Sequence, residues 1–220
     1  MKAAIRKLKT WWARRRVPRA DFSIVSNNCW GAHVYQTLKL PYTTPFVGLF
    51  ISPDSYVRLL ADFPQSLSTP LQFKERSAEA WVNQMREAHA YRWPIGSLDN
   101  GIEIQFMHYH SPTEAREKWQ RRLARLMKRP ERWFFKFCDR DGCTAEHRAF
   151  FDQLPYLNKV FFTTRQDCPL RCAVRIPLAE PHVPDGRILS ELSPAYFDSA
   201  GWINGGPGHV GRLGKWLNCV

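Results

Sequence analysis

The sequence predicts an α/β protein, a three-layer sandwich in which a largely parallel or mixed sheet carries helices on both faces. Strand-like apolar runs such as RWFFKFC at 132–138 and NKVFFTT at 158–164 alternate with amphipathic helical patterns. Strands that alternate with helices along a chain favour parallel pairing with crossover helices. The chain of 220 residues is long enough to bury a sizeable core as one domain.

The first half of the chain supplies the expected elements in order. Phe22 to Val25 are predicted to form a buried strand, and the apolar spacing after Gly31 predicts a helix. Further along we expect a strand at 45–51, a helix with Ser52 as N-cap and Pro53 in its first turn, and a helix opened by a capping pattern at Ser77.

A hairpin and a long helix follow in the middle of the chain. Asp99-Asn100-Gly101 is a hairpin signal between two strand-like stretches. The pattern at 111–129 predicts the longest helix, with Ser111 as N-cap, acidic residues early and basic residues late, as the helix dipole favours. The strands at 132–138 and 158–164 then enclose a turn and a short helix.

The carboxyl-terminal pattern is looser. Pro169, Pro177, Pro181 and Pro184 break it up, and the segment INGGPGHVGRLG is rich in glycine. We therefore expect residues 21–220 to form a single α/β domain, in which 166–220 is an irregular elaboration.

Residues 1–20 form a basic amphipathic segment with eight cationic side chains and no acid, within a chain of net charge +12. Apolar and tryptophan side chains fall near one helical face, which is typical of a helix on an anionic membrane surface. We expect residues 1–17 to bind such a surface; a solvated basic arm or a nucleic-acid arm are the alternatives. No recognisable nucleic-acid motif accompanies the segment, so no nucleic-acid partner is expected.

The cysteines indicate in which cellular compartment the protein works. Their spacing shows no regular disulfide framework, and no secretory signal precedes the domain; the six positions are 29, 138, 143, 168, 172 and 219. We expect reduced thiols in a cytoplasmic protein that is peripheral on the inner face of the membrane. Cys138, Cys143, Cys168 and Cys172 have spacings that fit a four-thiolate zinc site poorly, so no metal is expected.

The stretch SNNCWG at 26–31 lies where the first strand ends and a helix begins, a place where ligands and reactive groups collect. Cys29 is a candidate nucleophile there, with a pKa expected to be lowered by the helix N-terminus. Asn27 and Asn28 are candidate oxyanion or substrate donors. The alternative for Cys29 is a buried core cysteine, and for the asparagine pair it is a role in tying the turn.

A second strand end carries His108, Tyr109 and His110 before the helix that opens at Ser111. If this strand lies beside the first strand and parallel to it, His108 reaches Cys29 as a general base. Tyr109 is a candidate substrate contact. Arg121 and Arg122 belong to a basic helix face that either holds an anionic substrate or is simply solvated.

A third strand end carries Asp139 and Asp141 in the Asp-x-Asp spacing with which many sugar transferases hold a metal and a nucleotide diphosphate. An aspartate-rich turn before a glycine explains the same residues.

Several stretches in the same order resemble a known family. They are FSIVSNNCWGAHVYQTLKLPYTTPFVGLFI, WPIGSLDNGIEIQFMHY, EAREKWQRR and FFKFCDRDGC with FDQLPYLNKVFFT. Together they resemble Domain of Unknown Function 1919, a bacterial family usually labelled exopolysaccharide biosynthesis proteins, over about residues 21–165. The resemblance implies a three-layer α/β fold and a setting in surface polysaccharide assembly, with the basic segment and the carboxyl-terminal region outside it.

These observations lead to three functional hypotheses. The first is a transferase that makes or decorates a surface polysaccharide, by acyl transfer at Cys29 and His108 from an activated donor such as an acyl thioester. The second is a metal-dependent glycosyltransferase that uses a nucleotide sugar and the Asp139/Asp141 pair. The third is a non-catalytic module that binds a carbohydrate or a lipid-linked saccharide through Trp30, Trp93 and Trp119.

Overall fold

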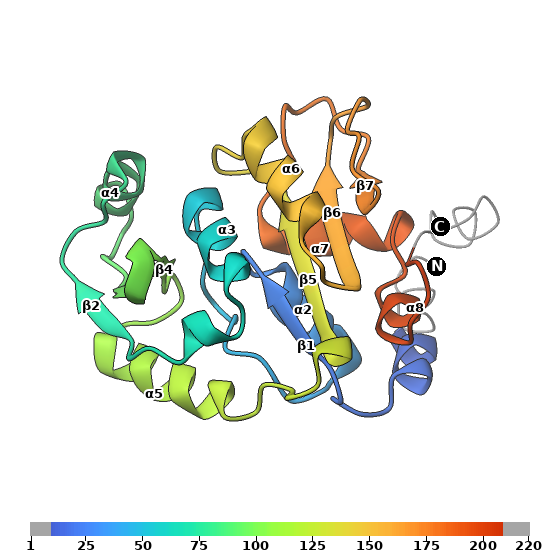
Figure 1. Cartoon of the computed structure of the whole chain (residues 1–220), viewed down its shortest axis with the longest axis horizontal. Helices are drawn as coiled ribbons and strands as arrows, with labels where there is room; N and C mark the ends of the chain where they lie inside the picture. Colours follow the sequence, from blue (N-terminus) through green and yellow to red (C-terminus); the bar gives the residue numbers. More distant parts are fainter. Residues whose placement is uncertain (1–9, 209–220) are drawn as a thin grey trace.

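A computed structural model describes residues 10–208 of the chain and places a four-stranded sheet at its centre (Figure 1). Its strands are β1 (Ser23–Ser26), β5 (Trp133–Cys138), β6 (Asn158–Thr163) and β7 (Ala173–Arg175). They are hydrogen-bonded in the order β1-β5-β6-β7, and every neighbouring pair is parallel. The predicted strands at 22–25, 132–138 and 158–164 are therefore confirmed, and so is their parallel pairing.

Helices cover both faces of this sheet, because alternate residues of β5 point to opposite sides. Phe134 and Cys138 pack with the core shared by α2 (Trp30–Leu38), α7 (Gly186–Leu192) and α8 (Ser199–Ile203). Phe135 and Phe137 pack on the other side, with α3 (Pro53–Ala61) and α6 (Ala145–Gln153). The predicted layered α/β fold is confirmed.

A second, smaller sheet lies beside α3 and α5 (Pro112–Leu123), on the left of Figure 1. Its strands β2 (Gln72–Lys74), β3 (Ile95–Ser97) and β4 (Glu103–Gln105) pair antiparallel in that order. The hairpin prediction is confirmed, since Asn100 and Gly101 have positive φ angles of 62° and 69° in the connection. Helix α4 (Ala80–Glu87) lies between β2 and β3 in the chain.

Two expectations about the middle of the chain are wrong. Residues 45–51 form no strand; Phe50 makes a single bridge to Gln105, because Pro45 lacks a donor and Gly48 turns the chain at φ +71°. The strand that precedes His108 is β4, which belongs to the small antiparallel sheet and does not pair with β1. Any approach of His108 to Cys29 must therefore come from loop packing.

The carboxyl-terminal region is more regular than its prolines suggested. After β6 it contributes β7 to the main sheet and α7 and α8 to one face; short 3-10 turns occur at Gln65–Leu67, Asp99–Gly101, Pro130–Arg132 and Ser193–Ala195. Phe197 and Trp202 pack against Trp30 with ring centroids 6.2 and 6.4 Å from it. Residues 173–203 thus complete the core around α2.

The basic amino-terminal segment is only partly within the described residues, since 1–9 lie outside them, as do Cys219 and the second half of the glycine-rich stretch. Residues 10–16 are helical. The end of this helix contacts the domain, since Val17 is buried and Arg16 forms an ion pair of 2.8 Å with Asp198. Trp11 and Trp12 remain 47% and 59% exposed. Within residues 10–208 no helix has the length and apolar character to cross a bilayer.

The packing of α2 on β1 generates a stability prediction. A Cβ atom on Gly31 would lie 2.9 Å from both Ile24 Cγ2 and Ser26 Cβ, which are buried in the strand below. We expect Gly31→Ala to lower the free energy of unfolding by about 1–2 kcal/mol, because the steric cost exceeds the gain in helix propensity. Urea denaturation would measure the difference; a stabilised variant would contradict this close packing.

Candidate functional site

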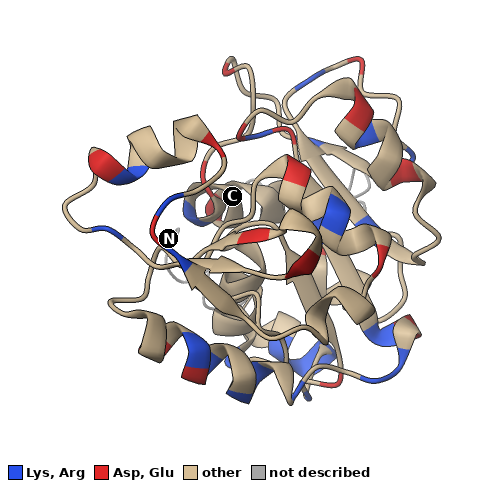
Figure 2. Ribbon diagram, turned by 60° about the vertical axis from the view of Figure 1, so that its left-hand side comes forward, with Lys and Arg blue, Asp and Glu red and all other residues tan. Residues whose placement is uncertain are grey.

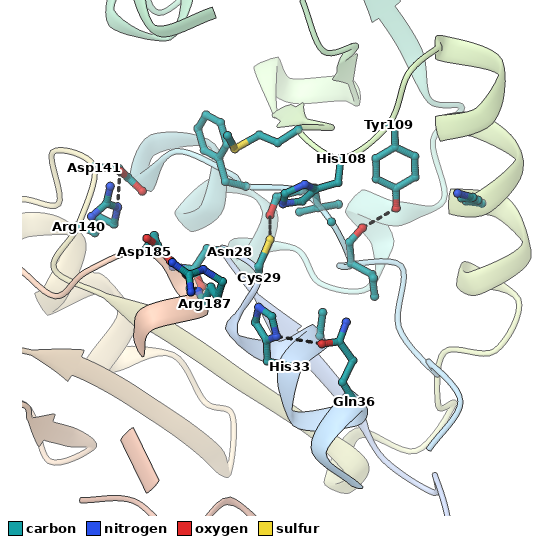
Figure 3. Close-up of a pocket in the computed structure, with 18 of the residues that line it drawn as sticks. Asn28, Cys29, His33, Gln36, His108, Tyr109, Arg140, Asp141, Asp185 and Arg187 are labelled. Atoms are coloured by element: carbon teal, nitrogen blue, oxygen red, sulfur yellow. Dashed lines mark hydrogen bonds and ion pairs between the residues drawn. The ribbon is translucent and has the colours of Figure 1, made fainter. Parts of the chain in front are cut away.

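A cavity of about 650 Å³ opens beside the carboxyl ends of β1 and β5. Its walls come from the β1–α2 junction, the 47–50 loop, the 107–109 loop, α5, the loop after β5 and the start of α7. The carboxyl ends of parallel strands are where open α/β sheets bind ligands. Figure 3 shows the lining side chains, with Cys29 and His108 at its centre.

Cys29 lies at the N-cap position of α2 and is half-buried in the cavity wall. Its Sγ lies 3.8 Å from the carbonyl oxygen of Leu49. The expectation of a lowered pKa is wrong: burial raises the pKa of the Cys29 thiol above its ordinary value, and the nearby charge of Lys136 offsets only part of that rise. Cys29 is therefore a protonated thiol at neutral pH and needs a base to become a nucleophile.

His108 lines the same cavity, and in Figure 3 its ring lies on the side toward which the Cys29 side chain points. The loop that carries it is fixed by a 3.1 Å hydrogen bond from the His108 backbone N–H to the carbonyl of Gly48. Burial, together with His33 and His89, lowers the pKa of His108, so its imidazole is neutral at pH 7. A neutral imidazole can accept a proton.

The two asparagines do not act as predicted. The Nδ2 groups of Asn27 and Asn28 lie 3.7 and 3.6 Å from the sulfur of Cys138, so neither amide is directed at a substrate. Their Oδ1 atoms accept hydrogen bonds from the ammonium group of Lys136 at 3.1 and 2.9 Å. Asn28 still lines the cavity, whereas Asn27 is fully buried beneath it.

Lys136, which donates hydrogen bonds to both asparagines, is a buried residue that sequence reasoning missed. It is fully buried, and desolvation lowers the pKa of its ammonium group despite the opposing influence of Cys138, Asp141 and Asp139. Its Nζ also lies 3.3 Å from Cys138 Sγ. The available signal was the lone charged residue in the apolar run WFFKFC, since an unpaired lysine is seldom buried.

The structure places only one of the two predicted aspartates, Asp141, in the cavity wall. The carboxylate of Asp139 accepts hydrogen bonds from the Thr163 hydroxyl and from the backbone N–H groups of Thr164 and Val183, and it does not line the cavity. Asp141 does line it, at a positive φ of 60°, in an ion pair of 3.2 Å with Arg140. Burial raises the pKa of the Asp141 carboxyl.

Of the two aromatic residues predicted to contact a substrate, Tyr109 lines the cavity and Trp30 does not. Trp30 is buried, with its indole N–H donating to Ser193 Oγ at 2.9 Å, and Trp93 and Trp119 are equally inaccessible. These three indoles are core residues that are not available to stack on a sugar, which corrects the expectation for Trp30. Tyr109 does line the cavity, although its ring is buried.

The basic face of α5 contributes one of its two predicted arginines. Arg122 lines the cavity together with Lys118, whereas Arg121, one position earlier, is exposed outside it. The helix positions two adjacent side chains about 100° apart, so only one of them can face the cavity. Among the described residues, no group of three or more His, Cys, Asp or Glu side chains is arranged to hold a metal ion.

The start of α7 supplies a wall that the sequence pattern did not predict. Asp185, Gly186 and Arg187 line the cavity. Asp185 caps α7 through its own carboxylate, and a Cβ on Gly186 would lie 2.7 Å from the Trp30 backbone nitrogen. The sequence Pro184-Asp185-Gly186 is typical of a helix start, but it does not indicate that this helix begins near Cys29.

These features define an α/β protein with a cavity at the carboxyl edge of its parallel sheet, lined by both polar and apolar side chains. The chain belongs to the family described as Domain of unknown function (DUF1919), whose model matches residues 1–204. The family resemblance is thereby confirmed, but the match also includes the basic segment and most of the carboxyl-terminal region that we expected to lie outside it.

A relative in Haemophilus influenzae is described as an uncharacterised protein. It is 35% identical over 167 residues, which are 74% of this chain and 73% of that protein.

The pKa shifts predict an order of thiol reactivity. Burial raises the pKa of Cys143 to about 12 and that of Cys172 to about 11, whereas Cys29 is shifted less and lines the cavity. We expect iodoacetamide to label Cys29 slowly at pH 7, faster as the pH rises above 9, and before Cys143 and Cys172. Peptide mass spectrometry would measure this, and rapid labelling of Cys29 at pH 6 would contradict a raised pKa.

Proposed function

We propose that the protein is a transferase that works in the biosynthesis or decoration of a bacterial surface polysaccharide, with Cys29 as nucleophile and His108 as general base. The observation that carries this proposal is that both side chains line one cavity, although they come from different sheets. The chemistry that best suits a thiol and a neutral imidazole is acyl transfer. The polysaccharide setting rests on the family resemblance alone.

The reaction divides into two balanced steps. His108 takes the proton of the Cys29 thiol while the sulfur attacks the carbonyl carbon of an acyl thioester donor. The donor's thiolate leaves with that proton, and an acyl-Cys29 enzyme remains. A saccharide hydroxyl, deprotonated by His108, then attacks the same carbonyl carbon, and the Cys29 thiolate departs and regains its proton.

The electrostatic setting defines the proton transfer that this assignment requires. The raised pKa of Cys29 and the lowered pKa of His108 keep both groups neutral before substrate binds. Lys136, held beneath Asn28, places a positive charge near the sulfur, and this charge favours the thiolate as it forms. Lys136 is thus a positioning and electrostatic residue, not a group that touches substrate.

The other hypotheses have less support from the geometry. A metal-dependent glycosyltransferase would need both aspartates at the site, whereas the Asp139 carboxylate already accepts three hydrogen bonds and does not line the cavity. A carbohydrate-binding module would need aromatic platforms other than Trp30, Trp93 and Trp119, which are buried. Binding of a saccharide without turnover would favour that class.

We also propose that the protein works on the cytoplasmic face of the membrane, attached by the helix at 10–16. Arg16 and Val17 fix this helix to the domain, while Trp11 and Trp12 stay exposed. The guanidinium of Arg15 lies 4.3 Å from the centre of the Trp11 ring, so indole and cation are presented together. This combination suits the interface of an anionic bilayer, where lipid-linked saccharides are found.

The catalytic assignment predicts a covalent adduct. Incubation with acetyl-coenzyme A should add an acetyl group to Cys29, and His108→Gln should slow its formation by about 10²- to 10⁴-fold because the general base is lost. Intact-protein and peptide mass spectrometry would measure it. Cys143→Ser is the matched control and should form the adduct normally.

Cys29→Ser should form no thioester and should melt within a few degrees of the wild type. Absence of an adduct from acetyl, succinyl and longer acyl thioesters alike would refute acyl transfer through Cys29. If Cys29→Ser instead loses both the adduct and its fold, Cys29 is a core cysteine.

The membrane assignment predicts a loss of vesicle binding. Trp11→Ala with Trp12→Ala should weaken co-sedimentation with phosphatidylglycerol vesicles, and high salt should weaken it further, because both indole burial and cation attraction contribute. Trp81→Ala removes another exposed indole, on α4, and serves as the control. If the double variant and the control partition alike, the helix is not the anchor.

A further inference from the structure

Arg122 differs from the other cations that line the cavity. Lys118 is paired with Glu114 at 2.5 Å, Arg140 with Asp141, and Arg187 with Glu191 at 3.4 Å. In the part of the chain that the structure describes, no carboxylate lies within 4.0 Å of Arg122. A guanidinium group is always charged, so Arg122 brings to the cavity a positive charge that no nearby carboxylate pairs with; Asp185, the lining carboxylate in no ion pair among the described residues, lies at the start of α7.

The Arg122 side chain is held in place on one side only. Its Nη1 donates to the Tyr109 hydroxyl and, at 3.4 Å, to the carbonyl of Val47. The guanidinium carbon lies 5.2 Å from the centre of the Tyr42 ring. Its Nε and Nη2 donate to no residue within 10–208. These two nitrogens form the edge of the fork with which arginine binds an oxyanion in a bidentate manner.

Tyr109 and the 47–49 loop make this arrangement rigid. The Tyr109 hydroxyl donates to the Val47 carbonyl at 2.5 Å, and the ring is buried. Gly48 lies so close to this ring that an added Cβ would be 3.2 Å from Tyr109 Cε2. An arginine that is fixed before a ligand arrives loses little conformational freedom on binding, which favours affinity.

We infer that the free edge of Arg122 binds a phosphate group of the substrate, and that this substrate is a phosphate ester whose uncharged part extends along the cavity to Cys29. Val47, Leu49 and Phe50 line the cavity together with Met85 and Met107, so a long apolar or weakly polar segment fits between the two ends. Arg140 and Arg187 lie on the wall beyond Cys29 together with Asp141 and Asp185, so that end of the cavity presents charges of both signs.

Two sources supply such a phosphate ester. One is an acyl-coenzyme A donor, whose diphosphate precedes a flexible pantetheine arm. The other is an isoprenoid phosphate that carries the saccharide acceptor. Both present the same oxyanion to Arg122 and an extended chain to the apolar wall. This inference rests on the proposed function for its choice of substrate, but the anion site itself can be tested without turnover.

The experiment is isothermal titration of the full-length protein with inorganic pyrophosphate, coenzyme A and farnesyl phosphate. Arg122→Gln should weaken binding of pyrophosphate by roughly 10- to 100-fold, the loss expected for a charged bidentate contact. Arg125→Gln removes the same charge from an exposed position just beyond α5 and should change affinity by less than about twofold. Tighter binding of coenzyme A or of farnesyl phosphate identifies the source.

Three outcomes would overturn the inference: no pyrophosphate binding by the wild type, equal weakening in Arg122→Gln and Arg125→Gln, or equal affinity for pyrophosphate and malonate. Should Arg122→Gln not fold, Arg122→Lys retains the charge but not the fork, and wild-type affinity in that variant would equally refute bidentate binding. Cys29→Ser should bind pyrophosphate normally, so failure of the covalent chemistry and failure of the anion site are distinguishable.

Discussion

The arrangement of the site depends on one buried cation. Lys136 lies in the middle of strand β5, where its buried amino group donates hydrogen bonds to the Oδ1 atoms of Asn27 and Asn28 and lies 3.3 Å from Cys138 Sγ. Those bonds fix the turn between β1 and α2, which in turn fixes Cys29 in the cavity wall. The asparagine pair therefore binds the lysine directly and influences the site only through it.

The same constraint explains why the amides are not oxyanion donors. Once both Oδ1 atoms bind Lys136, the Nδ2 groups must lie toward Cys138, away from the cavity. The positive charge that lowers the pKa of the Cys29 thiol is that of Lys136. In a poorly solvated interior its effect is stronger than in water. Burial nevertheless dominates, and the thiol keeps its proton until a base approaches.

Charge is otherwise dispersed over the domain. Figure 2 shows Lys and Arg interspersed with Asp and Glu over the helices and loops. Two features of this distribution matter for partners outside the chain. Arg122 has no carboxylate partner in the cavity among the described residues, and residues 1–20 contain eight cations and no acid. One suits a small anion and the other an anionic surface.

The sequence by itself determined the parallel strands, their covering helices and the polar strand ends, because apolar periodicity and capping residues act over a few neighbouring positions. It also predicted that Cys29 and His108 lie near each other, yet on a strand pairing that proved wrong: β1 and β4 belong to different sheets, and the two residues line one cavity together with the 47–50 loop. Only the tertiary structure decided which of Asp139 and Asp141 faces the cavity, that Arg122 does so and Arg121 does not, and that α7 closes one wall. Those choices depend on packing between segments distant in the chain, which no local pattern encodes.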